Sequence, residues 1–243
     1  MEDKKATIYE HLQELRRVII ISMVASFIGI AVSYLFLRET LMAVVFGPYR
    51  NLGKELVIIG VAEGFLVQLK LACVGGILIA SPIIIWQVMS FILPALYNNE
   101  KRVFLVSFFV ALFLFIAGVT FGYKFVFGLG LSMFLLDFTQ GLTAMISASR
   151  YLSFFISFLL PFGLIFQIPL VTYLLSRLGL ISPSFLRSKR GYAVLVIFIL
   201  AAILTPPDVL SQILLALPML LLYEISILLA VLVDKKKKRK QDK

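Results

Sequence analysis

The sequence is poor in the residues that build disulfide-bonded domains and most hydrolytic active sites. It has one cysteine, Cys73, and one histidine, His11, among 243 residues. A single cysteine excludes an internal disulfide and a multi-cysteine metal site. One histidine and the lack of a GxxxxGKS/T phosphate-binding loop favour a protein that is not an enzyme and that carries no cofactor or metal. Charge is also scarce, at 15% of residues, which excludes a soluble globular surface.

Six apolar runs separated by short polar segments account for most of the chain, which is 61% hydrophobic with a mean hydropathy of +1.03. A membrane-crossing helix needs about 20 apolar residues. The sequence therefore predicts an all-α polytopic membrane protein of six transmembrane helices in one membrane domain, 1–243. The predicted spans are residues 18–37, 65–94, 103–136, 152–176, 192–204 and 209–233. Residues 1–17 are expected to form a cytoplasmic amphipathic segment, residues 18–233 the bundle and residues 234–243 a basic cytoplasmic tail.

Basic residues are concentrated in every second polar segment. Of the 23 Lys and Arg residues, 17 lie in those segments and four lie in the loops between them. The positive-inside rule then predicts that both termini are cytoplasmic. The net charge of +10 is expected to meet anionic lipids at the membrane surface rather than nucleic acid. The basic segments are residues 1–17, 96–102, 177–191 and 234–243.

The runs are unequal in length, which predicts an uneven and concave bundle with short fifth and sixth spans. The run 192–204 has 13 residues and reaches only about 20 Å as a helix, less than the roughly 30 Å of hydrocarbon. Kinks are expected at prolines in the fourth and sixth spans. Gly118 and Gly122 predict a close helix contact. The loop 38–64, with a turn at Pro48, is expected to cap the outer side.

Several polar side chains fall inside or at the edges of the predicted spans, where an ionised group costs about 2.5–3.5 kcal/mol. Lys70 and Lys124 lie near span ends and are expected to reach the interface. Gln167 precedes Pro169, so its amide could satisfy a backbone carbonyl that the proline frees. Glu224 lies deeper, and is expected to be either protonated or paired. A functional and a structural role were equally favoured for Glu224.

Two carboxylates stand out on the predicted cytoplasmic side. Residues 8–16 have apolar residues at helical spacing, which predicts a short amphipathic helix on the membrane surface with Glu14 on its polar face. Glu100 follows the second span. Acidic groups on a basic face suggest a docking point for a cationic ligand. The alternative is local ion pairing of Glu14 with Arg17 and of Glu100 with its basic neighbours.

Four segments together with the six-span layout resemble the TatC family, the multispanning receptor subunits of the twin-arginine protein translocase. The most specific is the Pro206, Pro207 and Asp208 turn between the last two apolar runs. The segments are HLQELRR at 11–17, PALYNNEKR at 94–102, SPSFLRSKR at 182–190 and LTPPDVLSQILLALPM at 204–219.

The resemblance implies a protein of the bacterial cytoplasmic membrane that binds twin-arginine signal peptides of folded precursors, with Glu14 and Glu100 as the binding carboxylates. Arg16, Phe91 and Pro48 match positions that the family uses in or near precursor handling. Thr205 and Gln212 would contact single-span TatA- and TatB-type partners. Energy would come from the membrane potential or from partners, and a homo-oligomer within a larger complex stays open. Gln167 departs from a glutamate common in the family.

Two other functions fit part of this pattern. A secondary transporter would explain the polar groups in the spans, but no internal repeat is found. A structural membrane scaffold would be distinguished by failing to bind an isolated signal peptide.

Overall fold

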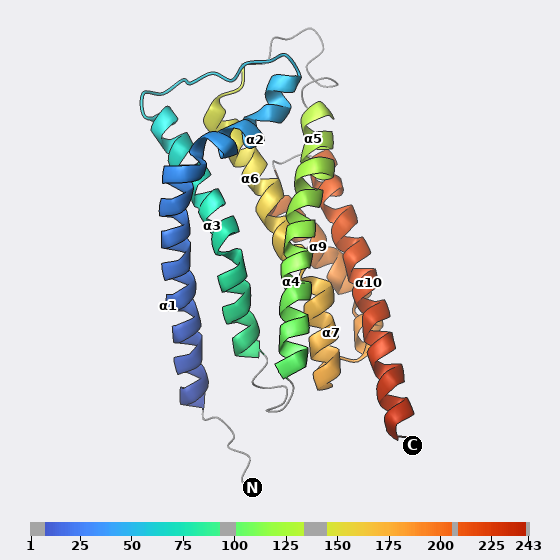
Figure 1. Ribbon diagram of the computed structural model, residues 1–243. Coiled ribbons are helices and arrows are strands. Elements are labelled where there is room, and N and C mark those ends of the chain that lie inside the picture. The colour runs from blue at the N-terminus through green and yellow to red at the C-terminus, as the bar shows by residue number, and fades with distance from the viewer. Residues whose placement is uncertain (1–7, 93–100, 134–144, 206–208, 242–243) are drawn as a thin grey trace. The chain divides into compact units, whose positions relative to one another are not determined.

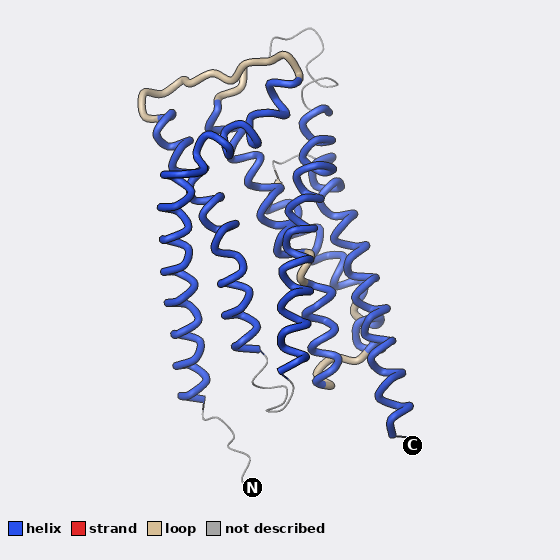
Figure 2. The backbone as a smooth tube through the Cα atoms, in the orientation of Figure 1, coloured by secondary structure: helices blue, strands red, loops and turns tan. Residues whose placement is uncertain are grey.

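The computed structural model describes residues 8–92, 101–133, 145–205 and 209–241, and nearly all of these residues are helical (Figure 2). Helix is the expected state for apolar runs of this kind, because each backbone N–H and C=O finds its partner within the same segment. Two short π-helical stretches interrupt the α-helices. The elements are α1 Ile8–Val32, η1 Ser33–Leu37, α2 Arg38–Asn51, α3 Glu63–Ile92, α4 Lys101–Phe121, η2 Gly122–Phe127, α5 Gly128–Ser132, α6 Ala148–Ile165, α7 Ile168–Leu178, α8 Pro183–Ser188, α9 Arg190–Leu204 and α10 Val209–Gln241.

The chain divides into two compact units. The first unit comprises Met1–Gly47 and Gly60–Leu112, and the second comprises Pro48–Ile59 and Phe113–Lys243. The first unit therefore contains α1, η1, most of α2, α3 and the beginning of α4. The second contains the remaining helices together with the end of α2.

In the first unit, α1 and α3 pack side by side and run in opposite directions (Figure 1). They approach each other closely at Gly29 and Gly76, where a Cβ on Gly29 would collide with the carbonyl oxygen of Gly76. A Cβ on Gly76 would likewise collide with the backbone of Ile30. Small residues at a helix interface let two backbones come within van der Waals contact, which is a main source of helix association in lipid. These two glycines fix the register of the pair.

The N-terminal segment differs from the prediction in one respect. Residues 8–16 are helical, but they are the first part of α1 and not a separate helix on the membrane surface. Helix α1 runs without a break into η1 and then into α2. The first predicted span, 18–37, is therefore the middle of a longer helical stretch, Leu12–Asn51, of 40 residues.

The predicted outer loop 38–64 is wrong in its first half. Residues 38–51 form α2, and Pro48 lies inside this helix instead of in a turn. The sequence Gly47 followed by Pro48 suggested a turn, but Gly47 has open space around its Cβ position and the helix passes through both residues. Only the part after Asn51 is a loop, with Gly53 in the left-handed conformation at φ +69°.

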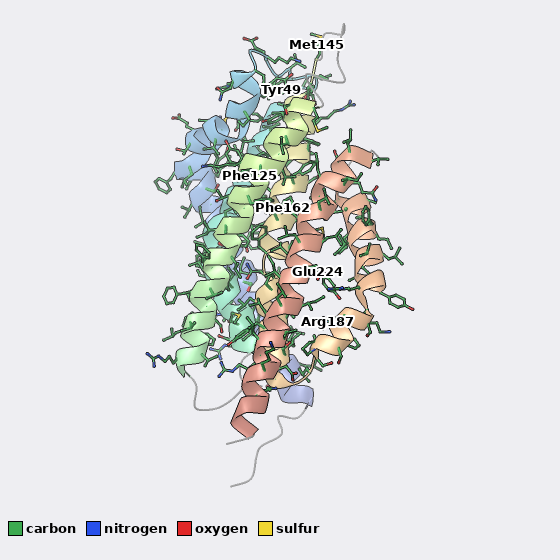
Figure 3. The ribbon with its side chains drawn as sticks, turned by 90° about the vertical axis from the view of Figure 1, so that its right-hand side faces the viewer. Tyr49, Phe125, Met145, Phe162, Arg187 and Glu224 are labelled. Carbon is green, nitrogen blue, oxygen red and sulfur yellow. The ribbon has the colours of Figure 1, made fainter. Side chains whose placement is uncertain are left out.

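The second unit is built around aromatic side chains of η2 and α6. Phe127 is buried and lies with its ring centroid 5.0 Å from that of Phe155 and 5.7 Å from that of Tyr151. Tyr49, at the end of α2, is fully buried and meets Tyr151 edge-on at 5.4 Å. Val57 forms backbone hydrogen bonds with residues 146 and 148. Burial of Tyr49 and this short bridge attach residues 48–59 to α6 (Figure 3 labels Tyr49).

The predicted close contact at Gly118 and Gly122 is confirmed. A Cβ on Gly118 would collide with the carbonyl oxygen of Phe162, and one on Gly122 would lie 3.0 Å from the Phe162 side chain. Phe162 itself is fully buried. The long third run thus packs on α6 through glycines, and it contains the π-helical stretch η2.

The fourth predicted span, 152–176, is divided into α6 and α7 at Phe166 and Gln167. Pro161 lies inside α6, whereas Pro169 lies in the first turn of α7, where a missing N–H costs no hydrogen bond. The prolines were expected to bend one helix. Pro169 instead begins a new one.

Five helical stretches of the described residues are long and apolar enough to cross a membrane. The remaining predicted span, 192–204, coincides with α9, which has 15 residues, so six crossings stay a prediction. The prediction of a short sixth span is wrong, because α10 has 33 residues and continues into the basic tail. The five stretches are Leu12–Asn51, Glu63–Ile92, Arg102–Ser132, Ala148–Leu178 and Val209–Lys235.

Replacing Gly118 by leucine should lower the thermal stability of the purified protein in detergent. The side chain has to displace the Phe162 backbone, and overpacking of this kind costs about 1–3 kcal/mol. Gly128→Leu is the matched control, because nothing lies within 4 Å of a Cβ at Gly128. Equal melting temperatures for the two variants would show that the Gly118 contact is not needed.

Candidate functional site

The register of α1 and α3 places Glu14 and Phe91 at the same end of the first unit. Both residues are 15 positions from the Gly29 and Gly76 contact, Glu14 before it and Phe91 after it, and the helices are antiparallel. At ~1.5 Å per residue each lies about 22 Å from the contact. Glu14 and Arg16 are exposed, and Phe91 is partly buried in the last turn of α3. The sequence alone does not show that these residues lie at the same height along the helix pair.

Glu100 lies outside the described residues, as do Pro206, Pro207 and Asp208. The segment between the end of α3 at Ile92 and the start of α4 contains Glu100. Helix α4 starts at Lys101 immediately after it.

The predicted partner contacts, Thr205 and Gln212, both form hydrogen bonds within the α9 and α10 pair. The Thr205 hydroxyl donates to the carbonyl of Ala201 at 2.8 Å and is buried. The Gln212 amide donates to the carbonyl of Phe198 at 3.0 Å, which joins α10 to α9. A direct contact with a partner requires an exposed group, and Thr205 is buried. Gln212 is only partly buried.

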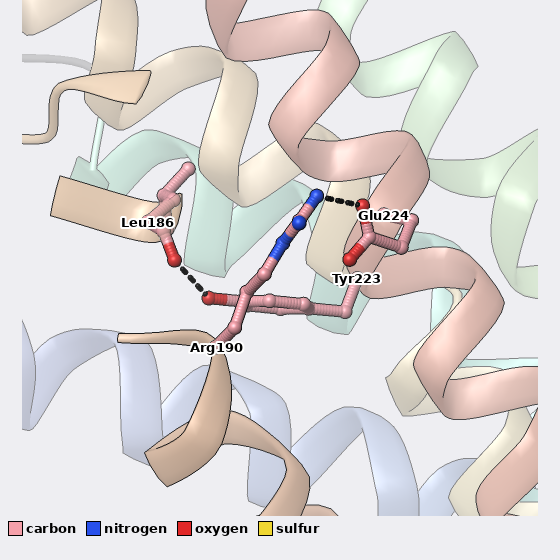
Figure 4. Close-up of polar contacts among 4 residues, drawn as sticks. All are labelled: Leu186, Arg190, Tyr223 and Glu224. Carbon is pink, nitrogen blue, oxygen red and sulfur yellow. Dashed lines mark hydrogen bonds and ion pairs between the residues drawn. The ribbon is translucent and has the colours of Figure 1, made fainter. Parts of the chain in front are cut away.

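Glu224 is paired, as one of the two expectations for it required. Its carboxylate accepts a hydrogen bond from the guanidinium of Arg190, the first residue of α9, at 2.6 Å (Figure 4). Both side chains are 51% exposed. The neighbouring Tyr223 hydroxyl donates to the carbonyl of Leu186 at 2.8 Å. These two contacts attach α10 to the beginning of α9 and to α8.

An apolar contact supports the same junction. Leu186 of α8 is buried against Ile227 and Ala230 of α10. In Figure 3 Arg187, which follows Leu186, lies toward the C-terminal end of α10 from Glu224. The predicted loop 177–191 is therefore partly helical and packed along α10, with α8 begun by the Ser182 hydroxyl, which accepts from the N–H of Phe185.

The basic tail is helical through Gln241 and is not a detached peptide. Lys237 donates a hydrogen bond to the carbonyl of Ser176 at 3.2 Å, in the last turn of α7. A cation at the carbonyl end of a helix is favourable because it complements the negative end of the helix dipole.

As predicted, the Gln167 side chain donates to a backbone carbonyl, but not to the carbonyl that Pro169 leaves without its usual partner. Its backbone N–H bonds to Leu164 rather than to Gly163, and its side-chain amide then donates to the Gly163 carbonyl at 3.4 Å. Lys124 is exposed in η2, and Lys70 is partly buried in α3. Among the residues that the structure describes, no three His, Cys, Asp or Glu side chains come together as metal ligands do.

Sequence reasoning missed Arg190, Tyr223 and Lys237. Arg190 was counted only as one of the basic residues that set the topology, and the tail only as a basic cytoplasmic segment. A usable signal was present in Glu224, because a carboxylate in an apolar run requires a cation nearby. Nothing local in the chain indicates which cation pairs with Glu224.

The chain matches the family model described as "Sec-independent protein translocase protein (TatC)" over residues 10–218. Among curated relatives, the TatC protein of Carboxydothermus hydrogenoformans is 45% identical over 238 residues, which cover 97% of both chains. That of Aquifex aeolicus is 40% identical over 96% of this chain and 98% of its own length. A crystal structure titled "Twin Arginine Translocase Receptor- TatC" is 39% identical, with a TM-score of 0.83 over 93% of this chain and all of the other.

Helices of this length and apolarity, together with these relatives, define a multispanning membrane protein that acts in protein translocation. The chain belongs to the TatC family, a component of the Sec-independent protein translocase. Of the three functions weighed from the sequence, the family supports the translocase component, which is a transport function and not catalysis.

The Arg190 and Glu224 pair should contribute a small, measurable coupling to stability. Both side chains are half exposed, and exposed pairs contribute about 0.2–1 kcal/mol. A double-mutant cycle of Arg190→Gln and Glu224→Gln, read by thermal unfolding in detergent, should return a coupling in that range. Strictly additive effects of the two substitutions would show that the pair adds nothing.

Proposed function

We propose that this chain is the receptor that binds twin-arginine signal peptides of folded precursors and recruits single-span TatA- and TatB-type partners. The observation that carries the proposal is the exposed carboxylate of Glu14 at the level of Phe91 in the last turn of α3. The solved relative described above carries the word receptor in its title, which supports the same assignment.

The proposed topology has six crossings of the bacterial cytoplasmic membrane, with both termini in the cytoplasm. The support is the charge distribution, because 17 of the 23 basic residues then lie on the cytoplasmic side. In this topology Glu14 faces the compartment in which precursors are made and folded.

Two exposed ion pairs together would provide only about 0.4–2 kcal/mol, too little to select one class of signal peptide. The apolar segment of the signal therefore has to bind as well, lying against the exposed apolar side chains of the first unit. The α1 residues Ile19, Met23 and Phe27 present such a surface at spacings of four residues. In a partly dehydrated contact, charge-assisted hydrogen bonds contribute about 1.5–3 kcal/mol each. The planar guanidinium of arginine suits a carboxylate better than the ammonium of lysine does.

Replacing Glu14 by glutamine should weaken binding of a twin-arginine peptide to the purified chain by roughly tenfold to a hundredfold, the equivalent of one charge-assisted contact. Binding can be measured by fluorescence anisotropy in nanodiscs. Glu39→Gln is the matched control, because Glu39 is an exposed carboxylate in the first turn of α2. A twin-lysine peptide should bind the unsubstituted chain more weakly than the twin-arginine peptide.

Unchanged affinity in the Glu14→Gln, Glu100→Gln double variant would contradict the proposed receptor function. Unchanged affinity in the single variant alone would show that Glu100 carries the interaction.

The partner contact is proposed on α9 and the adjoining part of α10. Leu195, Ile199 and Ile203 form an exposed stripe on α9, whereas Ile197 and Ala201 on the other side are buried. The side-chain amide of Gln212 donates an N–H to the Phe198 carbonyl, and its oxygen can accept a hydrogen bond from a partner helix. A polar group at a lipid-facing position favours association with a helix that carries its own polar side chain. Thr205 would act by holding the last turn of α9.

Gln212→Leu should reduce cysteine crosslinking between α9 and a single-span partner, because the partner loses its hydrogen-bond acceptor. Crosslinking from position 199 in membranes measures the contact. Ser226→Ala is the control, since the Ser226 hydroxyl is buried and bonds only to the Leu222 carbonyl of its own helix. Undiminished crosslinking of Gln212→Leu would exclude Gln212 from the contact.

A further inference from the structure

A hollow of about 400 Å³ lies at the N-terminal end of α1, beside the proposed signal-binding carboxylate. It is lined by Gln13, Arg16, Arg17, Ile20 and Ile21. These positions recur at intervals of three and four, so they share one face of the helix. The described residues that line the hollow therefore lie on a single stripe of α1 in the first unit.

The lining changes from polar to apolar along that stripe. Gln13, Arg16 and Arg17 come first, and Ile20 and Ile21 follow one turn later, about 5.4 Å further along the helix. The continuous apolar run of α1 begins at Val18. The polar part of the hollow thus lies where lipid headgroups meet the hydrocarbon, and the apolar part lies on the hydrocarbon side. A phospholipid has the same order, with a polar headgroup followed by apolar acyl chains.

The charge of the hollow selects among phospholipids. Arg16 and Arg17 are exposed, and within the described part of the chain neither forms an ion pair or a hydrogen bond. A guanidinium binds phosphate oxygens with two parallel N–H donors. A zwitterionic lipid brings its own ammonium group, which repels both arginines. An anionic lipid brings no such group.

We propose that this hollow binds the headgroup of one anionic phospholipid, with its phosphate on Arg16 and Arg17 and an acyl chain along Ile20 and Ile21. The proposal rests on the proposed function in one respect, namely that Glu14 receives a cationic signal. Residues 13–17 carry one carboxylate and two guanidinium groups, so on their own they repel a dicationic ligand. A bound phosphate offsets the two arginines and leaves Glu14 to attract the signal.

The lipid can be tested directly, without a signal peptide. Native mass spectrometry of the full chain in detergent, with phosphatidylglycerol and phosphatidylcholine added in equal amounts, should show preferential retention of phosphatidylglycerol. Arg17→Gln should lower that retention by about fivefold, the effect of one cation near a membrane surface. Arg17→Lys should retain an intermediate amount. Arg187→Gln is the matched control, because Arg187 is an exposed arginine of α8 outside the hollow.

Three results would overturn the lipid site. One is equal retention of the two lipids by the unsubstituted chain, and another is an equal loss in Arg17→Gln and Arg187→Gln, which would indicate general charge attraction. The third is displacement of the lipid by inorganic phosphate at millimolar concentration, which would indicate a site for a free anion. A melting temperature within the error of the unsubstituted chain shows that Arg17→Gln is folded.

The consequence for signal binding is tested in nanodiscs of the two lipids. Binding of the twin-arginine peptide to empty nanodiscs is subtracted from each measurement. The peptide should then bind the unsubstituted chain more tightly in phosphatidylglycerol than in phosphatidylcholine. Arg17→Gln should remove most of this difference between the two lipids. If the chain does not retain phosphatidylglycerol preferentially but Glu14→Gln still weakens peptide binding, the lipid site alone is overturned. If the chain retains phosphatidylglycerol preferentially but substitution of Glu14 and Glu100 leaves the peptide affinity unchanged, the proposed receptor function alone is overturned.

Discussion

Every backbone amide and carbonyl that enters hydrocarbon must find its hydrogen-bond partner within the protein, and most of this structure follows from that requirement. The apolar runs become helices because helices satisfy it locally. Where the helix is interrupted, a side chain takes over. At the break between α6 and α7, the amide of Gln167 donates to the Gly163 carbonyl, which the backbone N–H of Gln167 leaves without its usual partner. At the end of α9 the Ala201 carbonyl accepts from both the N–H and the hydroxyl of Thr205.

Once the backbone is satisfied, the helices associate through small residues and buried aromatic rings. Gly29 and Gly76 bring α1 and α3 together, and Gly118 and Gly122 bring the third run against Phe162. These contacts have a functional result. By fixing the register of α1 on α3, the first pair holds Glu14 at the level of Phe91, so a packing interaction between two glycines positions a carboxylate about 22 Å away.

The helices were predictable from the sequence because apolar length and charge alternation are strong signals, and each predicted run overlaps a helix. The boundaries were less predictable. Pro48 suggested a turn, yet it lies inside α2, because a proline in a helix removes one donor without always ending the helix. The tail was predicted only to be basic and cytoplasmic, because nothing local in a lysine run indicates that Lys237 reaches Ser176. The partner of Glu224 was likewise a matter of tertiary structure, since Arg190 is 34 positions away in the chain. The candidate carboxylate Glu14 was found by its charge, but its level relative to Phe91 required the helix register.

The contacts along α10 explain why the fifth apolar run is short. Ser176, in the last turn of α7, accepts from Lys237, whereas Arg190, the first residue of α9, pairs with Glu224. The two positions on α10 are 13 residues apart, or about 20 Å of helix. The connection from α7 therefore doubles back along α10 before α9 begins, and α8 fills this stretch. In the second unit, the first turn of α9 therefore lies nearer to the N-terminal end of α10 than the last turn of α7 does. At ~1.5 Å per residue the 15 residues of α9 reach only about 22 Å, so α9 offers lipid a shorter apolar surface than α10 does.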